Sequence, residues 1–229
     1  MTIPDIIDDL VNNPRPVFCL DTCVLLDLVR AGWREPTAEL RAAMRLLGAV
    51  EDAPPRAAVV VTYLIPREFG QNIRDVRNDA DNAVQKAERL FDAAALVWRT
   101  VTPPAFSDAP TLVDDLVAAA HWLMDAARSV DRDAACVDRA VDRVVNKTKP
   151  AANGGVKDAI HLEHYLALSH AIAAAGLPCR RAFVSSNKAD FSESRTKPQL
   201  DPGLKEKDFD PAGLEFFPRL EAAVGALGI

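Results

Sequence analysis

Residues 17–29, with the sequence VFCLDTCVLLDLV, decide the fold of this chain. The run from Val17 to Leu20 is short and apolar, which is typical of a β-strand. Asp21 interrupts the apolar run, and the segment from Cys23 to Val29 is apolar enough to begin a helix. The order strand, turn, helix is the building unit of an α/β fold.

The alternation of strands and helices continues along the chain. Further strands are expected at residues 57–61, 182–184 and 214–217. Helices are expected at residues 36–50, 62–98, 111–130, 133–145 and 156–175. Strands that alternate with helices predict an α/β fold: a mainly parallel, twisted sheet flanked by helices in a Rossmann-type, three-layer arrangement.

A single domain, residues 1–229, is expected, with a helical insertion at residues 70–150. Within that insertion the sequence is rich in Ala with charges at intervals, and it contains no strand pattern. Residues 192–211 are charged and rich in Pro, which predicts a surface loop.

The composition is that of an ordinary soluble globular protein, with 49% apolar and 26% charged residues. No apolar run reaches about 18 residues, and residues 1–10 lack the basic start and apolar core of a secretory signal. We therefore expect a cytoplasmic protein without membrane contact. The net charge of -6 argues against a broad basic surface for nucleic acid, but it allows a local basic track.

Polar residues gather near the ends of the expected strands, where sheets of this kind bind ligands. Asp21 directly follows the first strand, and Glu68 lies about two turns into the helix after the second. Asp158 lies in the first turn of the helix at 156–175. The strand at 182–184 is followed by three polar candidates: Ser186, Asn187 and Asp190. Four acidic groups are therefore expected to converge.

Four motifs in this order resemble those of PIN domains. Residues 19–27, CLDTCVLLD, are similar to the opening motif hydrophobic-D-T/S-N-hydrophobic-hydrophobic. Glu68 matches the helical glutamate of the family, and residues 158–160, DAI, resemble its third acidic position. Residues 183–191, FVSSNKADF, resemble its final strand and loop.

The resemblance covers roughly residues 16–68 and 154–220, and it implies an endoribonuclease that uses Mg²⁺ or Mn²⁺. Many members are toxins of the VapC type paired with an antitoxin, so the candidate roles are a toxin or a defence nuclease. The candidate partners are RNA, an antitoxin protein and a second copy of the chain. Cys23 stands where the family usually has Asn, and Asn187 stands where many members have an acid, which leaves Asp190 as the acid of that loop.

The acids carry the expected chemistry. Hydrolysis of a phosphodiester needs a nucleophilic water and neutralisation of charge on the phosphoryl oxygens, and hard divalent cations supply both. We assign Asp21 and Asp158 as the primary metal ligands. Glu68 is assigned as a further ligand or a base that orients water, and Asp190 as a ligand that acts partly through water. Without metal, crowded acids raise one another's pKa values.

Neighbouring polar residues are assigned supporting roles. The hydroxyl of Thr22 either caps the following helix or orients a site water, Ser186 positions water or phosphate, and Asn187 is a neighbour in the site. We interpret His161 and His164 as packing residues and not as ligands, because no Glu-x-x-His partner accompanies them.

Two other functions stay open. One is a catalytically weak RNA- or protein-binding module, which Cys23 and Asn187 favour. The other is a phosphohydrolase that forms an aspartyl-phosphate at Asp21, although Cys23 replaces the second Asp of the usual D-x-D signature. Basic residues such as Lys157 and Lys188 either line an RNA path or only solvate the surface.

Overall fold

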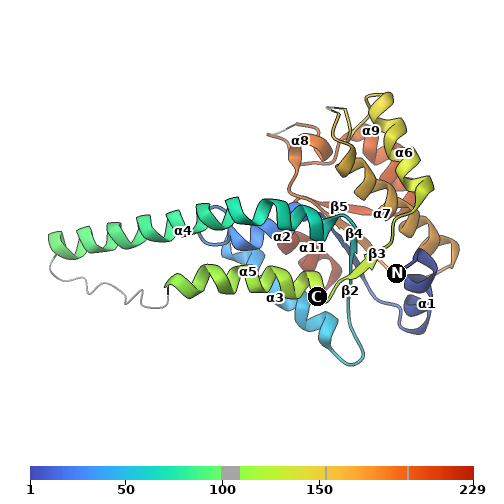
Figure 1. The fold of residues 1–229 in the computed structure, drawn as a ribbon. Coiled ribbons are helices and arrows are strands. Elements are labelled where there is room, and N and C mark those ends of the chain that lie inside the picture. The colour runs from blue at the N-terminus through green and yellow to red at the C-terminus, as the bar shows by residue number, and fades with distance from the viewer. Residues whose placement is uncertain (99–108, 153, 195) are drawn as a thin grey trace.

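The computed structural model describes residues 1–98, 109–152, 154–194 and 196–229, and this part of the chain contains one five-stranded, all-parallel sheet (Figure 1). The strand order is β3-β2-β1-β4-β5, with β1 in the centre. The strands are β1 (Val17–Leu20), β2 (Ala58–Thr62), β3 (Arg128–Val130), β4 (Arg181–Val184) and β5 (Glu215–Phe217). The predicted α/β fold with a parallel sheet is confirmed.

Helices connect the strands and form the outer layers. They are α1 (Ile3–Asn12), α2 (Thr22–Val29), α3 (Thr37–Glu51), α4 (Ile65–Trp98), α5 (Ala109–Asp125), α6 (Ala134–Val145), α7 (Val156–Ala174), α8 (Lys188–Phe191), α9 (Pro202–Leu204), the π-helical turn η2 (Lys205–Phe209), α10 (Asp210–Ala212) and α11 (Leu220–Leu227). Among the residues that the structure describes, no helix is both long and apolar enough to cross a membrane.

Alternate side chains of each strand pack against helices on opposite faces of the sheet. Phe18 and Leu20 of β1 belong to a core shared with α2, α3, α5 and α11. Val17 and Cys19 belong to a second core, shared with α1 and α7. All four side chains of β1 are buried, which explains why the strand reads as an uninterrupted apolar run. The result is the expected arrangement of three layers.

The stretch at residues 70–150 was expected to be helical throughout, and this was wrong, because it also contributes a strand to the sheet. β3 pairs in parallel with the end of β2, and Val130 lies opposite Thr62. The helix expected at 111–130 ends at Asp125 instead. Since β3 has three residues, of which Val130 alone is fully buried, it leaves no apolar run in the sequence.

The segment at residues 192–211 was expected to be a surface loop, but it contains the short helical turns α9, η2 and α10. Leu204 and Phe209 from these turns are buried. The ring of Phe209 lies 6.0 Å from that of Phe183 in β4. Turns of three to five residues are too short to show a helical period in the sequence, which is why they were missed.

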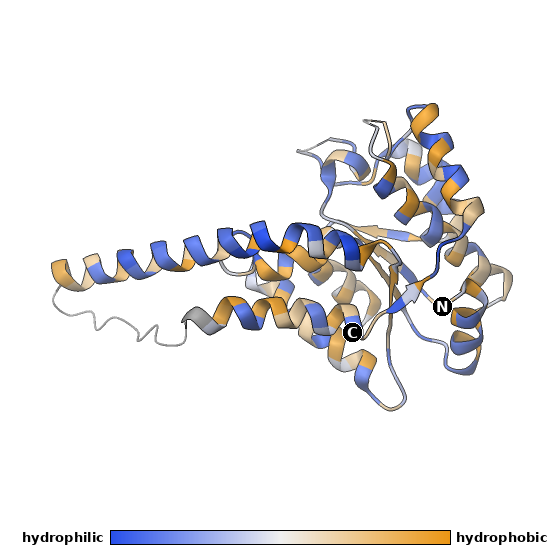
Figure 2. Ribbon diagram, in the orientation of Figure 1, coloured by the Kyte–Doolittle hydropathy of each residue, from blue (hydrophilic) through white to orange (hydrophobic). Residues whose placement is uncertain are grey.

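Helices α4 and α5 run antiparallel and extend away from the sheet (Figure 1). Phe69 and Val76 of α4 and Val113 and Ala120 of α5 are buried in the first core. Figure 2 shows that α4 is hydrophilic over most of its length and hydrophobic at its far end, whereas α5 is largely hydrophobic. The beginning of α4 lies at the carboxyl edge of the sheet and carries Glu68 there.

Two leucines provide a test of this core. Leu25 of α2 is fully buried, whereas Leu96 of α4 is 81% exposed. Leu25→Ala is expected to lower the free energy of unfolding by about 2–5 kcal/mol, because it removes apolar contacts and leaves a cavity. Leu96→Ala, the matched control, is expected to change it by less than about 0.5 kcal/mol. Denaturant unfolding followed by circular dichroism measures both changes, and equal losses would contradict the assigned core.

Candidate active site

The carboxyl ends of β1 and β4 lie at the point where the sheet reverses its winding. From β1 the chain continues to β2 on one side, and β4 pairs with the other side of β1. Doubly wound sheets bind ligands in the crevice at such a point. Asp21 follows β1 there, and its backbone N–H donates to the carbonyl of Val184 in β4 at 3.1 Å.

Hydrogen bonds to both carboxylate oxygens fix Asp21 between these strands. Oδ1 accepts from the backbone N–H of Thr22 at 2.6 Å, which caps the start of α2. Oδ2 accepts from the hydroxyl of Ser185 at 2.6 Å. Ser185 is a site residue that sequence reasoning missed, because Ser186 was chosen in its place. The hydroxyl of Ser186 donates to Asp27 instead.

Two further acids come to this edge from α7 and α8. Nδ2 of Asn187 donates to Oδ2 of Asp190 at 2.9 Å and to Oδ1 of Asp158 at 3.3 Å, so the amide joins the two acids. The pKa of Asp158 is raised to about 7, first by burial and then by the negative charges of Asp21 and Asp190. The charges of two predicted acids, Asp21 and Asp190, therefore act on a third, Asp158.

Glu68, the fourth predicted acid, is contacted by a hydrogen-bond donor and by a positively charged side chain. The hydroxyl of Thr22 donates to Oε2 of Glu68 at 2.7 Å, and Nζ of Lys157 lies 3.4 Å from Oε1. Burial alone would raise the pKa of Glu68. Hydrogen bonds from His161 and Thr22, together with the charges of His161 and Lys157, outweigh burial and lower the pKa to about 2. Glu68 is therefore an ionised carboxylate.

His161 forms a buried link from the sheet to Glu68, and the sequence did not reveal this contact. Its ring is 1% exposed, with Nε2 2.9 Å from Oε2 of Glu68 and Nδ1 2.6 Å from the hydroxyl of Thr62 at the end of β2. The spacing of Asp158 and His161 placed both on one face of the helix. Spacing alone could not show that this face meets α4.

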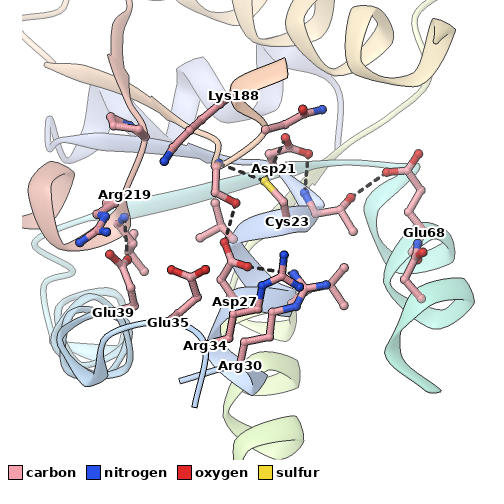
Figure 3. A pocket seen from close by; sticks show the side chains of 18 of the residues that line it. Asp21, Cys23, Asp27, Arg30, Arg34, Glu35, Glu39, Glu68, Lys188 and Arg219 are labelled. Atoms are coloured by element: carbon pink, nitrogen blue, oxygen red, sulfur yellow. Dashed lines mark hydrogen bonds and ion pairs between the residues drawn. The ribbon is translucent and has the colours of Figure 1, made fainter. Parts of the chain in front are cut away.

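A single pocket of about 590 Å³ brings most of the predicted residues together (Figure 3). Six of the seven line it: Asp21, Thr22, Glu68, Asp158, Ser186 and Asn187. Asp190 is not among the lining residues and meets the pocket through its contact with Asn187. Figure 3 shows Glu68 at one side of the pocket and Asp21 near its centre.

Cys23 occupies the pocket wall beside Asp21. Its thiol donates to Oδ2 of Asp21 at 3.3 Å and accepts from the backbone N–H of Ser186 at 3.2 Å. Burial, followed by the charge of Asp21, raises the pKa of Cys23 well above its ordinary value. The residue is therefore a neutral thiol that helps to join α2 to the segment after β4.

The oxygen atoms in the pocket fit a hard divalent ion such as Mg²⁺ or Mn²⁺. Oε1 of Glu68 is buried without a hydrogen-bond partner, and a cation would relieve the repulsion that contributes to the raised pKa of Asp158. Within the described ranges, no three His, Cys, Asp or Glu side chains are gathered as a metal-binding group. Mg²⁺ often keeps several waters and uses one or two protein carboxylates, so Asp21 and Asp158 would suffice.

Comparison of the chain with protein-family models, curated proteins and solved structures gave no match.

The link through His161 provides a stability test. His161→Phe leaves the ionised Glu68 and the hydroxyl of Thr62 without this partner, so the free energy of unfolding should fall by about 2–4 kcal/mol. His170→Phe changes an exposed histidine of the same helix and serves as the control, with an expected change within about 0.5 kcal/mol. Denaturant unfolding at pH 7 compares the two, and an unchanged His161→Phe variant would refute the link.

The raised pKa of Asp158 predicts a variant that is more stable than the wild type. Its folded pKa of about 7 lies above the ordinary 3.8, so the folded protein loses stability as pH rises from about 4 to 7. Asp158→Asn removes this loss. In buffer with EDTA it should raise the free energy of unfolding at pH 8 by about 2 kcal/mol, and by less at pH 5. Unfolding at both pH values tests this, and a variant less stable than the wild type at pH 8 contradicts it.

Proposed function

We propose that this protein is a metal-dependent endoribonuclease that hydrolyses RNA phosphodiester bonds. The observation that carries the proposal is the pocket at the switch point of the sheet, the place between β1 and β4 where the winding reverses. Asp21, Glu68 and Asp158 line this pocket from three separate parts of the chain. Acids far apart in sequence are rarely brought into one polar pocket without a function, because their repulsion costs stability. The resemblance to PIN domains supplies the reaction class.

Asp21 and Asp158 would hold Mg²⁺ or Mn²⁺, with Asp190 acting through water. The bound ion would supply neutralisation of phosphoryl charge and a more acidic water. Asn187 would hold the carboxylates of Asp158 and Asp190 at fixed positions relative to each other, since it donates a hydrogen bond to both. Ser186 lines the same pocket and would position water or a phosphate oxygen.

Glu68 suits the role of an electrostatic or metal-binding carboxylate better than that of a general base. A general base works best with a pKa near the operating pH, and the pKa of Glu68 is lowered to about 2. Its Oε1 atom has no hydrogen-bond partner and lies 3.4 Å from Nζ of Lys157. Thr22 and His161 would hold Oε2, and a bound cation would take the place of Lys157 beside Oε1.

The proposed activity also suggests a cellular role and partners for the protein. A cytoplasmic toxin restrained by an antitoxin protein, or a defence nuclease, fits an endoribonuclease of this type. A homodimer is a further candidate assembly. Identifying the product of the neighbouring reading frame and testing whether it binds and inhibits the protein separates the toxin role from the defence role.

A catalytically weak RNA- or protein-binding module is the second candidate. It is favoured by one observation, the lack of a gathered metal-binding group in the described residues. An aspartyl-phosphate mechanism is less well supported, because Cys23 stands at the position of the second Asp of the D-x-D signature, the residue that would serve as the acid.

Cleavage of a labelled RNA in Mn²⁺ tests the proposal. Asp21→Asn and Asp158→Asn should each lower the rate at least about 100-fold, because each removes a charge that would bind metal. Asp138→Asn changes an exposed acid of α6 and serves as the matched control, with wild-type activity expected. Activity should vanish in EDTA. Equal cleavage by all four proteins would refute the assignment, and binding of RNA without any cleavage would favour the binding module.

A further inference from the structure

The pocket continues beyond the acids into a region lined by basic side chains. Figure 3 shows Lys188 and Arg219 on the side of the pocket opposite Glu68, with Arg30 and Arg34 below its centre. The full pocket of about 590 Å³ is within the range that encloses a ligand of small-molecule size, about 300–1,000 Å³. A metal site that binds a single phosphate group does not need a pocket of that volume.

Acidic side chains also line this region, and two of them have partners within the protein. Asp27 pairs with Arg30 at 2.9 Å and accepts from Ser186. Glu39 accepts from the backbone N–H groups of Leu220 at 2.9 Å and Glu221 at 3.3 Å, at the positive start of α11.

Burial raises the pKa of Glu39, and the hydrogen bonds from Glu221 and Leu220 and the charge of Arg219 act against this rise. Glu35 is the third acid of this region. Among the described residues, Arg34, Lys188 and Arg219 form no ion pair. Their three positive charges exceed the two negative charges of Glu35 and Glu39, so this half of the pocket favours an anion.

The three cations come from separate parts of the chain. Arg34 lies between α2 and α3, Lys188 begins α8, and Arg219 immediately precedes α11. All three side chains belong to exposed residues. Arg and Lys of this kind bind phosphate groups through charge-assisted hydrogen bonds.

We propose that Arg34, Lys188 and Arg219 form a phosphate-binding subsite for a nucleotide next to the one that lies over the acids. The inference rests on the proposed function for its substrate class, a nucleic-acid strand. A nucleic-acid strand that occupies both places must carry at least two phosphates. Two sources present the same chemistry, an internal phosphate and a 5′-terminal phosphate.

Binding of a short fluorescent oligoribonucleotide in EDTA tests the subsite without any cleavage. Lys188→Ala and Arg219→Ala should each weaken binding by about threefold to tenfold, and each should reduce the slope of log K against log salt by about 0.7. Lys86→Ala and Arg41→Ala remove exposed cations outside the pocket and should leave both quantities unchanged. Thermal unfolding of each variant confirms that the fold is kept.

Glu35→Gln provides a test in the opposite direction. Removing this acid should tighten binding by about twofold to fivefold, because it opposes the three cations. A folding defect cannot produce tighter binding, so this variant separates an electrostatic effect from damage to the protein. Unchanged binding by Glu35→Gln together with unchanged binding by Lys188→Ala and Arg219→Ala overturns the proposal.

Oligonucleotides with a 5′-phosphate or a 5′-hydroxyl distinguish the two sources. If the variants lose affinity only for the 5′-phosphorylated strand, the subsite binds a terminal phosphate. If they lose affinity equally for both strands, the subsite binds an internal phosphate. Equal affinity for polyglutamate of matched length overturns the assignment to phosphate. If the variants weaken binding but the wild type never cleaves RNA, the subsite stands and the nuclease proposal fails. If cleavage occurs with unaltered binding by the variants, the subsite alone fails.

Discussion

The buried carboxylate of Asp21 is the anchor on which the site depends. It is 4% exposed, and hydrogen bonds from Thr22 and Ser185 tie it to the ends of β1 and β4. Burying a charge costs stability unless hydrogen bonds compensate for it. These bonds hold the carboxylate at the switch point of the sheet, and its charge then acts on Asp158 across the pocket.

The acids of the pocket differ in how their charge is balanced. Glu68 is stabilised as an anion by Thr22, His161 and Lys157, whereas Asp158 is destabilised as an anion by burial and by other acids. The negative charge of Glu68, at one side of the pocket, is therefore compensated within the protein. The negative charge around Asp158 is not. A divalent ion is the ligand that such an uncompensated centre favours.

Most of the fold could be predicted because it follows from local patterns. The buried strand β1 reads as an apolar run, and α7 is followed by Gly176, whose φ of 66° suits the position after a helix. Contacts between distant segments could not be read in this way. Ser186 was chosen where Ser185 contacts Asp21, since a shift of one residue in an extended segment reverses the direction of a side chain.

Titration of Mn²⁺ into metal-free protein, followed by isothermal calorimetry, tests the central claim that the acids meet to hold a cation. The wild type should bind Mn²⁺ with release of protons at pH 7, because the pKa of Asp158 is raised to about 7 and a bound cation displaces its proton. Asp158→Asn should bind at least about tenfold more weakly. Equal affinity in the two proteins, or no binding by the wild type at millimolar Mn²⁺, would contradict the claim.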